Sequence, residues 1–216
     1  MPPLNLVGDY GGGSLYLVAG LLAALLEARG SGQGQVVDAA ICDGVLSLMS
    51  NNQSHTLRGI YREQRGNNML DGGAPYYTTY RTSDGQFVSI GPIEPKFFAL
   101  LCRKLELPQE LWDAQNDRSR WHDLRDALAA AFRKDTREHW CHLLEGTDVC
   151  FAPVLALSEA AAHPHIQARS GFVDVAGVLH TAPAPRFSRT PSAIQGPAPA
   201  AAVSVAAVLD AWQGAI

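Results

Sequence analysis

The amino-acid sequence predicts a chain of mixed helices and strands, and three observations support this fold class. A glycine-rich stretch leads into an apolar, helix-forming run at residues 15–26. A hairpin pattern surrounds Asp84-Gly85, with aromatic and β-branched residues on both sides. Three helix patterns and one short apolar strand pattern follow between residues 94 and 154. The hairpin, these helices and this strand together predict a compact α+β unit.

The N-terminal segment is expected to form a loop followed by a buried helix. Residues 8–14 are rich in glycine, and Ser14 is placed to cap a helix that runs through the apolar residues 15–26. Gly30 is placed to end that helix. Because the helix is apolar nearly all round, we expect it to be buried.

The next segment is expected to connect this helix to the hairpin. Val36-Val37 is a β-branched pair that suits the end of a strand, and residues 38–56 have helical character. Residues 59–73 are rich in Arg, Asn and Gly, which is typical of a surface loop. We therefore place a domain boundary in this loop.

The α+β unit begins with the hairpin. The helix after it should start at Glu94-Pro95, because proline is favoured at the first helical position and an acidic residue favours a helix N-terminus. The elements expected in order are strands at 76–81 and 86–90, helices at 94–105, 120–132 and 136–144, and a strand at 149–154.

The C-terminal segment is expected to be mostly extended. A strand-like run at residues 171–175 leads into a proline-rich stretch, and proline disfavours both helix interiors and sheet interiors. An Ala/Val-rich run at residues 201–212 predicts a final helix.

Composition and charge exclude several classes of protein. Hydrophobic residues make up 47% of the 216 residues and charged residues 18%, which is incompatible with an intrinsically disordered chain. The net charge is -4, so the chain supplies no positive field for nucleic acid or for an anionic membrane surface. We therefore expect neither a nucleic-acid partner nor a membrane partner.

Targeting signals are not expected. The apolar run from Leu15 to Leu26 is shorter than the ~20 residues that span a bilayer. The only charge before Leu15 is that of Asp9, whereas a signal peptide has a basic start. The four cysteines have no CxxC spacing, which favours free thiols and a reducing, cytoplasmic location.

Two carboxylates and a glycine triplet are the residues that could carry chemistry. Asp9 and Glu94 lie at the mouths of two expected helices, where a carboxylate can act as a general acid or base. Gly11–Gly13 could offer backbone N–H donors to an anion or an oxyanion. On the residues alone, helix capping and close backbone packing are favoured over these roles. No metal-ligand spacing occurs, so we expect no metal.

Several long stretches resemble the alpha-methylacyl-CoA racemases, members of the family III CoA-transferase superfamily of the CaiB/BaiF type. The first is LNLVGDYGGGSLYLVAGLLAALLEARGSGQGQVVDAAICDG. The next is RGNNMLDGGAPYYTTYRTSDGQFVSIGPIEPKFF, and the C-terminal part contributes AAHPHIQAR and APAPRFSRTP. Together these stretches cover most of the chain in the order found in the family.

The resemblance implies a fold and an assembly. The fold class is α/β, with the remnant of a Rossmann-like large domain and a smaller α+β domain. Members of the family extend further at the N-terminus, so an N-terminally truncated chain is implied. Family members form interlocked homodimers, so we expect either such a dimer or a missing N-terminal half as partner. The domains expected are the end of the large CoA-binding domain at 1–38, a linker helix and loop at 39–77, the small domain at 78–163, and a returning segment at 164–216.

The resemblance also implies roles for individual residues. Asp9 corresponds to the catalytic aspartate, and Glu94 corresponds to a glutamate that supports the catalytic histidine. We expect substrate contacts from Tyr10, Gly11–Gly13 and Met69. The substrate is an acyl-CoA thioester, and coenzyme A enters as part of it, with no separate cofactor. The family places its histidine upstream, and the first histidine here is His55, so inversion by this chain alone should be impaired.

Three functions remain open from the sequence. The first is epimerisation of a 2-methylacyl-CoA, in which one residue removes the α-proton and another returns it on the opposite face. The second is a family III CoA-transferase, with the same aspartate as nucleophile and a mixed anhydride as intermediate. The segment Ile93-Glu94-Pro95 argues against it, because many transferases have a glycine-rich loop there. The third is a non-catalytic fragment that acts only as an interface module.

Overall fold

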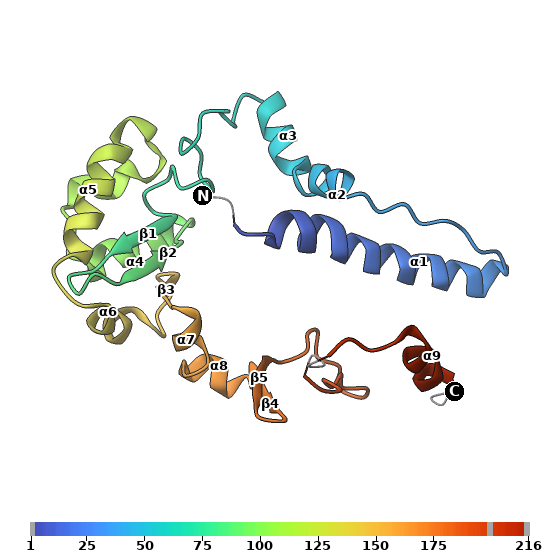
Figure 1. The fold of residues 1–216 in the computed structure, drawn as a ribbon. Coiled ribbons are helices and arrows are strands. Elements are labelled where there is room, and N and C mark those ends of the chain that lie inside the picture. The colour runs from blue at the N-terminus through green and yellow to red at the C-terminus, as the bar shows by residue number, and fades with distance from the viewer. Residues whose placement is uncertain (1–2, 198–200, 214–216) are drawn as a thin grey trace.

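The computed structural model describes residues 3–197 and 201–213. Figure 1 shows the arrangement of the elements along the chain. In chain order they are η1 (Leu6–Leu15), α1 (Tyr16–Ser31), α2 (Ile41–Leu48), α3 (Ser50–Leu57), β1 (Thr78–Arg81), β2 (Phe87–Ile90), α4 (Pro95–Lys104), η2 (Gln109–Asn116), η3 (Arg118–Arg120), α5 (Trp121–Phe132), α6 (Arg137–Leu144), β3 (Phe151–Val154), α7 (Leu157–Ala160), α8 (Pro164–Ala168), β4 (Phe172–Val175), β5 (Val178–Thr181) and α9 (Val205–Gln213).

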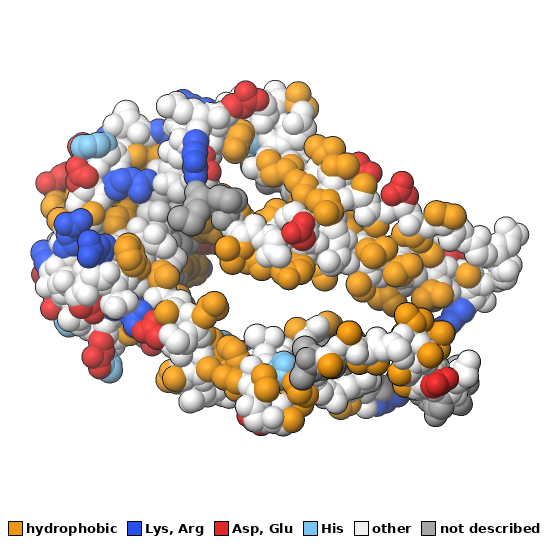
Figure 2. Space-filling model, in the orientation of Figure 1, with side chains coloured by type: hydrophobic (Ala, Val, Ile, Leu, Met, Phe, Trp, Pro, Cys, Tyr) orange, Lys and Arg blue, Asp and Glu red, His pale blue; other side chains and the backbone are white. Residues whose placement is uncertain are grey.

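Three parts of the chain can be followed in Figure 1. We call residues 6–57 the helical arm, residues 74–154 the sheet unit, and residues 172–197 with 201–213 the C-terminal arm. Both arms extend from the same side of the sheet unit, and the space-filling view shows open space between them (Figure 2). The buried hydrophobic core of the described residues lies within the sheet unit.

An antiparallel sheet of three strands, in the order β1-β2-β3, lies at the centre of the sheet unit. The predicted hairpin is present, and Gly85 takes a φ of 80° in its turn, a conformation that suits glycine. Val88 pairs with Tyr80 on one side and with Pro153 on the other. The strand predicted at 149–154 thus joins the hairpin as its third strand.

The core of the sheet unit is built from aromatic and aliphatic side chains. Phe132, from α5, stacks on Tyr80 with ring centroids 5.4 Å apart and meets Trp140 edge-on at 5.3 Å. Leu124 and Leu128, also from α5, are fully buried. The predicted helices at 94–105, 120–132 and 136–144 are confirmed as α4, α5 and α6, and they cover the sheet. Burial of these side chains is the main stabilisation of this unit.

The helical arm differs from the sequence prediction in three ways. Residues 8–14 are helical, because the chain from Leu6 onward makes wide turns such as Tyr10 N–H to Asn5 C=O at 3.2 Å. Ser14 therefore lies within a helix instead of capping one, and Gly32, not Gly30, ends α1 with a φ of 77°. The prediction of a buried helix is wrong for this chain, since α1 has no buried residue.

Other local predictions also need correction. Val36-Val37 lies in an irregular segment and not at a strand end. Pro164 begins the short helix α8, at the first helical position that proline favours. Residues 172–181 form a two-stranded hairpin, β4-β5, so the expected extended stretch begins after a second strand. The final helix is confirmed as α9.

The helical segment Leu6–Ser31 is long and apolar enough to cross a membrane, by length and composition alone. The sequence prediction excluded a span because it counted only the run after the supposed glycine loop. Core helices of globular proteins have the same length and composition, and the N-terminal part of this segment packs closely on α2.

Truncation of a core residue should cost far more stability than truncation in α1. Phe132→Ala removes a fully buried ring and should lower the free energy of unfolding of the 216-residue chain by about 3–5 kcal/mol. Leu25→Ala alters a side chain that is 61% exposed and should cost less than about 1 kcal/mol. Urea unfolding followed by tryptophan fluorescence measures both. Equal costs for the two variants would contradict this division of the chain.

Candidate active site

Asp9 lies on η1, within the wide helical turns that precede α1. Its side chain is exposed, as is that of its neighbour Tyr10. The hydroxyl of Ser14 donates a hydrogen bond of 3.1 Å to the backbone carbonyl of Asp9. The carboxylate therefore stays free to meet a ligand or another chain, while the backbone beneath it is fixed.

Gly12 and Gly13 bring η1 into close contact with α2. A Cβ placed on Gly44 of α2 would lie 1.9 Å from the carbonyl oxygen of Gly12, and one on Gly12 would lie 2.7 Å from Val45 Cγ2. Gly12, Gly13 and Gly44 are all buried. The glycine triplet thus permits two backbones to touch, which is the packing role that the residues alone favoured. Contact of Gly11–Gly13 with substrate remains a prediction.

Glu94 occupies the position before the first residue of α4. Its backbone carbonyl accepts hydrogen bonds of 3.0 Å from the N–H groups of Phe97 and Phe98, and Pro95 follows as the first helical residue. The Glu94 side chain makes no capping hydrogen bond and is exposed. The Glu94 carboxylate therefore does not cap α4, although its position before the helix suggested that role. It is available for another role.

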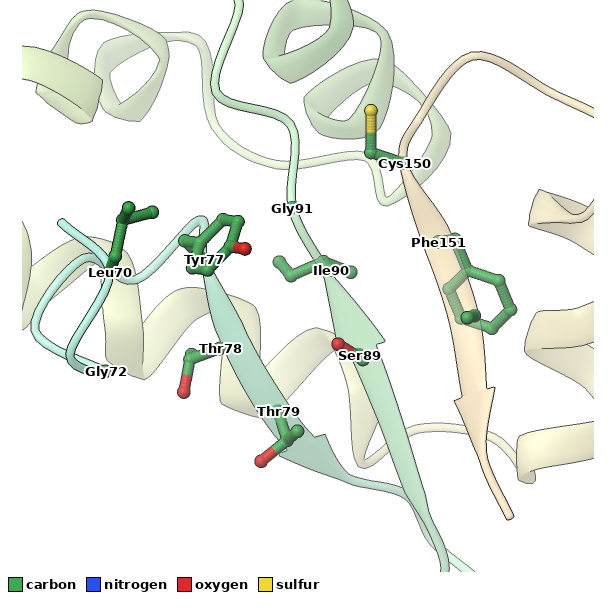
Figure 3. A pocket seen from close by; sticks show the side chains of 11 residues that line it. Leu70, Gly72, Tyr77, Thr78, Thr79, Ser89, Ile90, Gly91, Cys150 and Phe151 are labelled. Atoms are coloured by element: carbon green, nitrogen blue, oxygen red, sulfur yellow. The ribbon is translucent and has the colours of Figure 1, made fainter. Parts of the chain in front are cut away.

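A hollow of about 440 Å³ lies between the ends of the three strands and the loop before β1. Figure 3 shows Leu70 and Tyr77 on one side of it, Cys150 and Phe151 on the other, and Ile90 between them. The residues that line it are Leu70, Gly72, Tyr77, Thr78, Thr79, Ser89, Ile90, Gly91, Cys150, Phe151 and Ala152. Two residues separate Gly91 from Glu94 along the chain, so Glu94 follows just after the Gly91 end of this hollow.

Cys150 is a residue of this hollow that the sequence did not single out. Its carbonyl accepts a hydrogen bond of 2.9 Å from Gly91 N–H, which continues the pairing of β2 with β3. Burial raises the pKa of the Cys150 thiol, and the negative charges of Glu94 and Asp148 raise it further. The thiol is therefore held neutral and is a poor nucleophile.

Met69 lies on a loop that is held in shape by Asp71. The Asp71 carboxylate accepts hydrogen bonds from the backbone N–H groups of residues 66, 67, 68 and 73, and from the Asn68 side chain. Burial acts to raise the pKa of Asp71, but these hydrogen bonds outweigh it and lower the pKa below its usual value. Arg125, from α5, donates to the carbonyls of Gly72 and Gly73 at 2.8 and 2.7 Å.

The Met69 loop also closes a smaller hollow of about 190 Å³. Its lining combines Met69 and Leu70 with polar groups from α3 and with the Arg118 guanidinium. The loop therefore separates two hollows, and Leu70 lines both of them. Neither Asn68 nor Asp71 was predicted as a structural residue, although an acidic residue before Gly-Gly is a common turn signal.

The structure brings the expected site residues together in two separate groups. Asp9, Tyr10 and Gly11–Gly13 share η1, whose main packing contacts are with α1 and α2. Glu94 lies on the sheet unit. Among the described residues no group of three His, Cys, Asp or Glu residues is placed to hold a metal ion.

A family model described as "CoA-transferase family III" matches residues 2–202. The chain belongs to this family. It is 42% identical over 192 residues to "Alpha-methylacyl-CoA racemase" of Mus musculus, and 38% identical over 199 residues to the protein of the same name of Homo sapiens. These matches cover 88% of this chain and 50% and 52% of the two relatives. The chain thus spans about half the length of the curated relatives it matches.

More distant relatives and solved structures agree with this assignment. A "Succinyl-CoA--D-citramalate CoA-transferase" of Chloroflexus aurantiacus is 30% identical over 196 residues, which cover 86% of this chain and 48% of the relative. The crystal structure of Rv3272 from M. tuberculosis superimposes with a TM-score of 0.70 at 21% identity, covering 92% of this chain and 52% of that one. The family III CoA-transferase fold of the chain is therefore shown.

A methyl group on Gly44 should loosen the helical arm of this family III chain. Gly44→Ala forces η1 away from α2, because the new Cβ would otherwise lie 1.9 Å from the Gly12 carbonyl oxygen. Overpacking of this kind costs about 1–3 kcal/mol, so the amides of η1 should exchange with solvent deuterium at least fivefold faster. Gly30→Ala, where nothing lies within 4 Å, is the matched control. Unchanged exchange in Gly44→Ala would show that the contact is unimportant.

Loss of the Asp71 charge should destabilise the chain in a pH-dependent way. Because the folded-state pKa of Asp71 is lowered, its contribution is present above the unfolded pKa near 3.8 and is lost as the pH falls through the folded value. Asp71→Asn should cost about 1 kcal/mol at pH 7, and the difference from wild type should shrink toward pH 3. Urea unfolding at several pH values measures it. Asp113→Asn alters an exposed carboxylate without a hydrogen-bond partner among the described residues, and a matching loss there would refute the role of Asp71.

Proposed function

We propose that this chain is part of an acyl-CoA racemase that epimerises a 2-methylacyl-CoA thioester. The observation that carries the proposal is the identity of 42% and 38% to two relatives named alpha-methylacyl-CoA racemase, against 30% to the transferase relative. The free carboxylate of Glu94, close to a hollow that no charged side chain lines, supports the same chemistry. Coenzyme A enters as part of the substrate, without a separate cofactor.

The proposed reaction is removal and return of one proton. A base takes the α-proton of the thioester, and the electron pair moves into the carbonyl to give an enolate, which is reprotonated at the same carbon on the opposite face. A thioester α-carbon is a weak acid, so the base must be held at the reacting carbon while donors stabilise the enolate oxygen. In this proposal Asp9 is the acid–base group on one face.

Inversion needs a second acid–base group on the opposite face. By the resemblance this group is a histidine, and Glu94 holds it oriented and keeps its pKa matched to the reaction. None of the stretches that carry the resemblance supplies this histidine. We therefore propose that the complete site forms only when this chain meets the remainder of the fold, either as a missing half or as the partner in an interlocked homodimer.

The exposed apolar surface of the helical arm supports this proposal of an incomplete site. Leu21, Leu22, Leu25 and Leu26 of α1 are 47%, 63%, 61% and 74% exposed. Figure 2 shows hydrophobic side chains gathered along the inner sides of both arms. Full burial of each such leucine stabilises a protein by about 1.5–3 kcal/mol, so these surfaces favour being covered. In the proposal, the cover is the rest of the large CoA-binding domain.

The hollow beside Glu94 is the proposed site of the branched acyl group. Leu70, Ile90 and Phe151 contribute apolar side chains to its lining, beside the hydroxyl side chains of Thr78, Thr79 and Ser89. The neutral Cys150 thiol adds no charge. A lining without Lys or Arg suits a methyl-branched chain better than a dicarboxylate. We further propose a cytoplasmic location, consistent with all four cysteines being free, and a role in lipid metabolism.

Replacement of Asp9 should abolish inversion in the completed enzyme. The assay uses the chain alone and the chain extended by the N-terminal part of a racemase relative, because the matches span about half of those relatives. Asp9→Asn keeps the shape but removes the base, so racemisation of a 2-methylacyl-CoA should fall at least 100-fold. Deuterium uptake from the epimer that faces the histidine should persist. Chiral chromatography and mass spectrometry in deuterated water measure both.

Two outcomes would overturn the racemase proposal. Racemisation by Asp9→Asn at the parent rate, equal to that of the exposed-carboxylate control Asp38→Asn, would show that Asp9 is not the base. Trapping of an acyl group on Asp9 by hydroxylamine during turnover would establish the transferase, in which the aspartate is a nucleophile. Absence of both activities in the extended chain would leave the interface module as the function.

A further inference from the structure

A buried glutamine side chain contacts the backbone directly ahead of Glu94. Gln115, near the end of η2, is only 4% exposed. Its Nε2 donates hydrogen bonds to the carbonyl of Pro92 at 3.1 Å and to that of Ile93 at 2.8 Å. A single amide group thus bonds two successive carbonyls of the segment that leads into α4.

Gln115 is itself held in place from the opposite direction. Its backbone carbonyl accepts a hydrogen bond of 2.9 Å from Nε1 of Trp121, the first residue of α5. The Trp121 ring packs edge-on against Tyr76 with centroids 6.0 Å apart, and Ala114 beside Gln115 is fully buried. The amide therefore projects from a part of the core that cannot shift without disturbing α5.

The segment from Gly91 to Glu94 depends on few other contacts. Gly91 N–H bonds the Cys150 carbonyl, and Ile93 N–H bonds the Gly91 carbonyl, both at 2.9 Å. Pro92 is fully buried and donates no hydrogen bond. The two carbonyls that Gln115 bonds lie in the middle of this turn, so the amide determines the backbone direction in which the chain reaches Glu94.

We propose that Gln115 is a positioning residue for Glu94. Burial of an amide costs free energy unless the amide is hydrogen-bonded, and here both observed bonds go to the backbone segment that leads directly to Glu94. Gln115 does not line the hollow and is not placed to touch substrate. The functional meaning of this role rests on the proposed function of Glu94, but the positioning itself can be measured without any turnover.

Cys150 provides the measurement, because its thiol senses the Glu94 charge. Burial is the largest cause of the raised pKa of Cys150, and the Glu94 and Asp148 carboxylates add to it. Replacement of Glu94 by Gln should therefore lower the pKa of the thiol. The size of that decrease reports how close the position-94 side chain is held to Cys150, since charge interactions weaken with distance.

The experiment is a double-mutant cycle between positions 94 and 115 in the 216-residue chain. The rate of alkylation of Cys150 by iodoacetamide is measured against pH, and the Cys150 peptide is quantified by mass spectrometry. Gln115→Met keeps the side-chain volume but removes both hydrogen bonds. We expect Glu94→Gln to raise the alkylation rate near pH 8 in the parent chain, and the fold-change to be at least halved in the Gln115→Met background.

Gln109→Met is the matched control, because Gln109 is exposed on the same element η2. The Glu94→Gln effect should keep its full size in this background. If Gln115→Met does not fold, as judged by circular dichroism, Trp121→Phe replaces it, since it removes the bond to the Gln115 carbonyl and keeps a ring in the core. An undiminished Glu94→Gln effect in Gln115→Met or Trp121→Phe, or no effect of Glu94→Gln in the parent chain, would overturn the proposal.

The same variants separate this inference from the proposed function. In the extended, racemising enzyme, Gln115→Met should lower kcat at least fivefold and change KM less than twofold, because substrate binding does not involve Gln115. If the cycle shows coupling and no racemisation is found with any variant, the proposed function fails and the positioning role stands. If racemisation is found and the coupling is absent, the positioning role fails alone.

Discussion

The pairing of β2 with β3 is the constraint on which the candidate site depends. It places Ile90 opposite Phe151, two residues from distant parts of the chain, and the bond from Gly91 N–H to the Cys150 carbonyl extends the pairing by one step. The hollow lies at this end of the sheet, and the turn toward Glu94 begins here. A shift of β3 by one residue against β2 would turn Phe151 to the opposite face of the sheet and remove its ring from the lining.

The sheet unit and the helical arm differ in how much of their apolar surface they bury. The sheet unit buries Phe132, Leu124 and Leu128 completely within itself. The helical arm makes its closest contact through backbone, at Gly12 and Gly44, and leaves the leucines of α1 facing outward. Backbone contact without buried side chains supplies little hydrophobic stabilisation. The arm therefore has a defined shape but is not stabilised by a core of its own.

The sequence predicted correctly those elements that are determined by a few neighbouring residues. Asp84-Gly85 predicted the hairpin turn, because glycine takes the positive φ that the turn requires, and Glu94-Pro95 predicted the start of α4. Predictions failed where a tertiary contact decides the structure. The glycines at 11–13 were expected to form a loop, but their lack of side chains lets η1 pack on α2, which keeps them helical. The strand β5 was missed because the prolines after it dominated the pattern.

The candidate site could be predicted only in part, for the same reason. Asp9 and Glu94 were singled out as carboxylates near helix starts, yet their roles came from the resemblance and not from their spacing. Gln115 and Cys150 give no local signal, because each acts through backbone that is distant in the chain: Gln115 through Pro92 and Ile93, Cys150 through Gly91. Contacts of this kind are visible only after the sheet and its helices are assembled.

The backbone that carries Glu94 is held by more contacts than the backbone that carries Asp9, and this difference affects how a site could be assembled. Glu94 follows a turn that is bonded to Gln115 and paired with β3, within a unit that has its own core. Asp9 lies on a helix that is fixed on one side by α2 and continues into the exposed α1. If another part of the fold packed on α1, it would restrain Asp9 far more than Glu94. The helical arm that carries Asp9 has no core of its own, whereas the sheet unit that carries Glu94 has one. Assembly of the fold would then position Asp9 against a Glu94 that its own unit already holds in place.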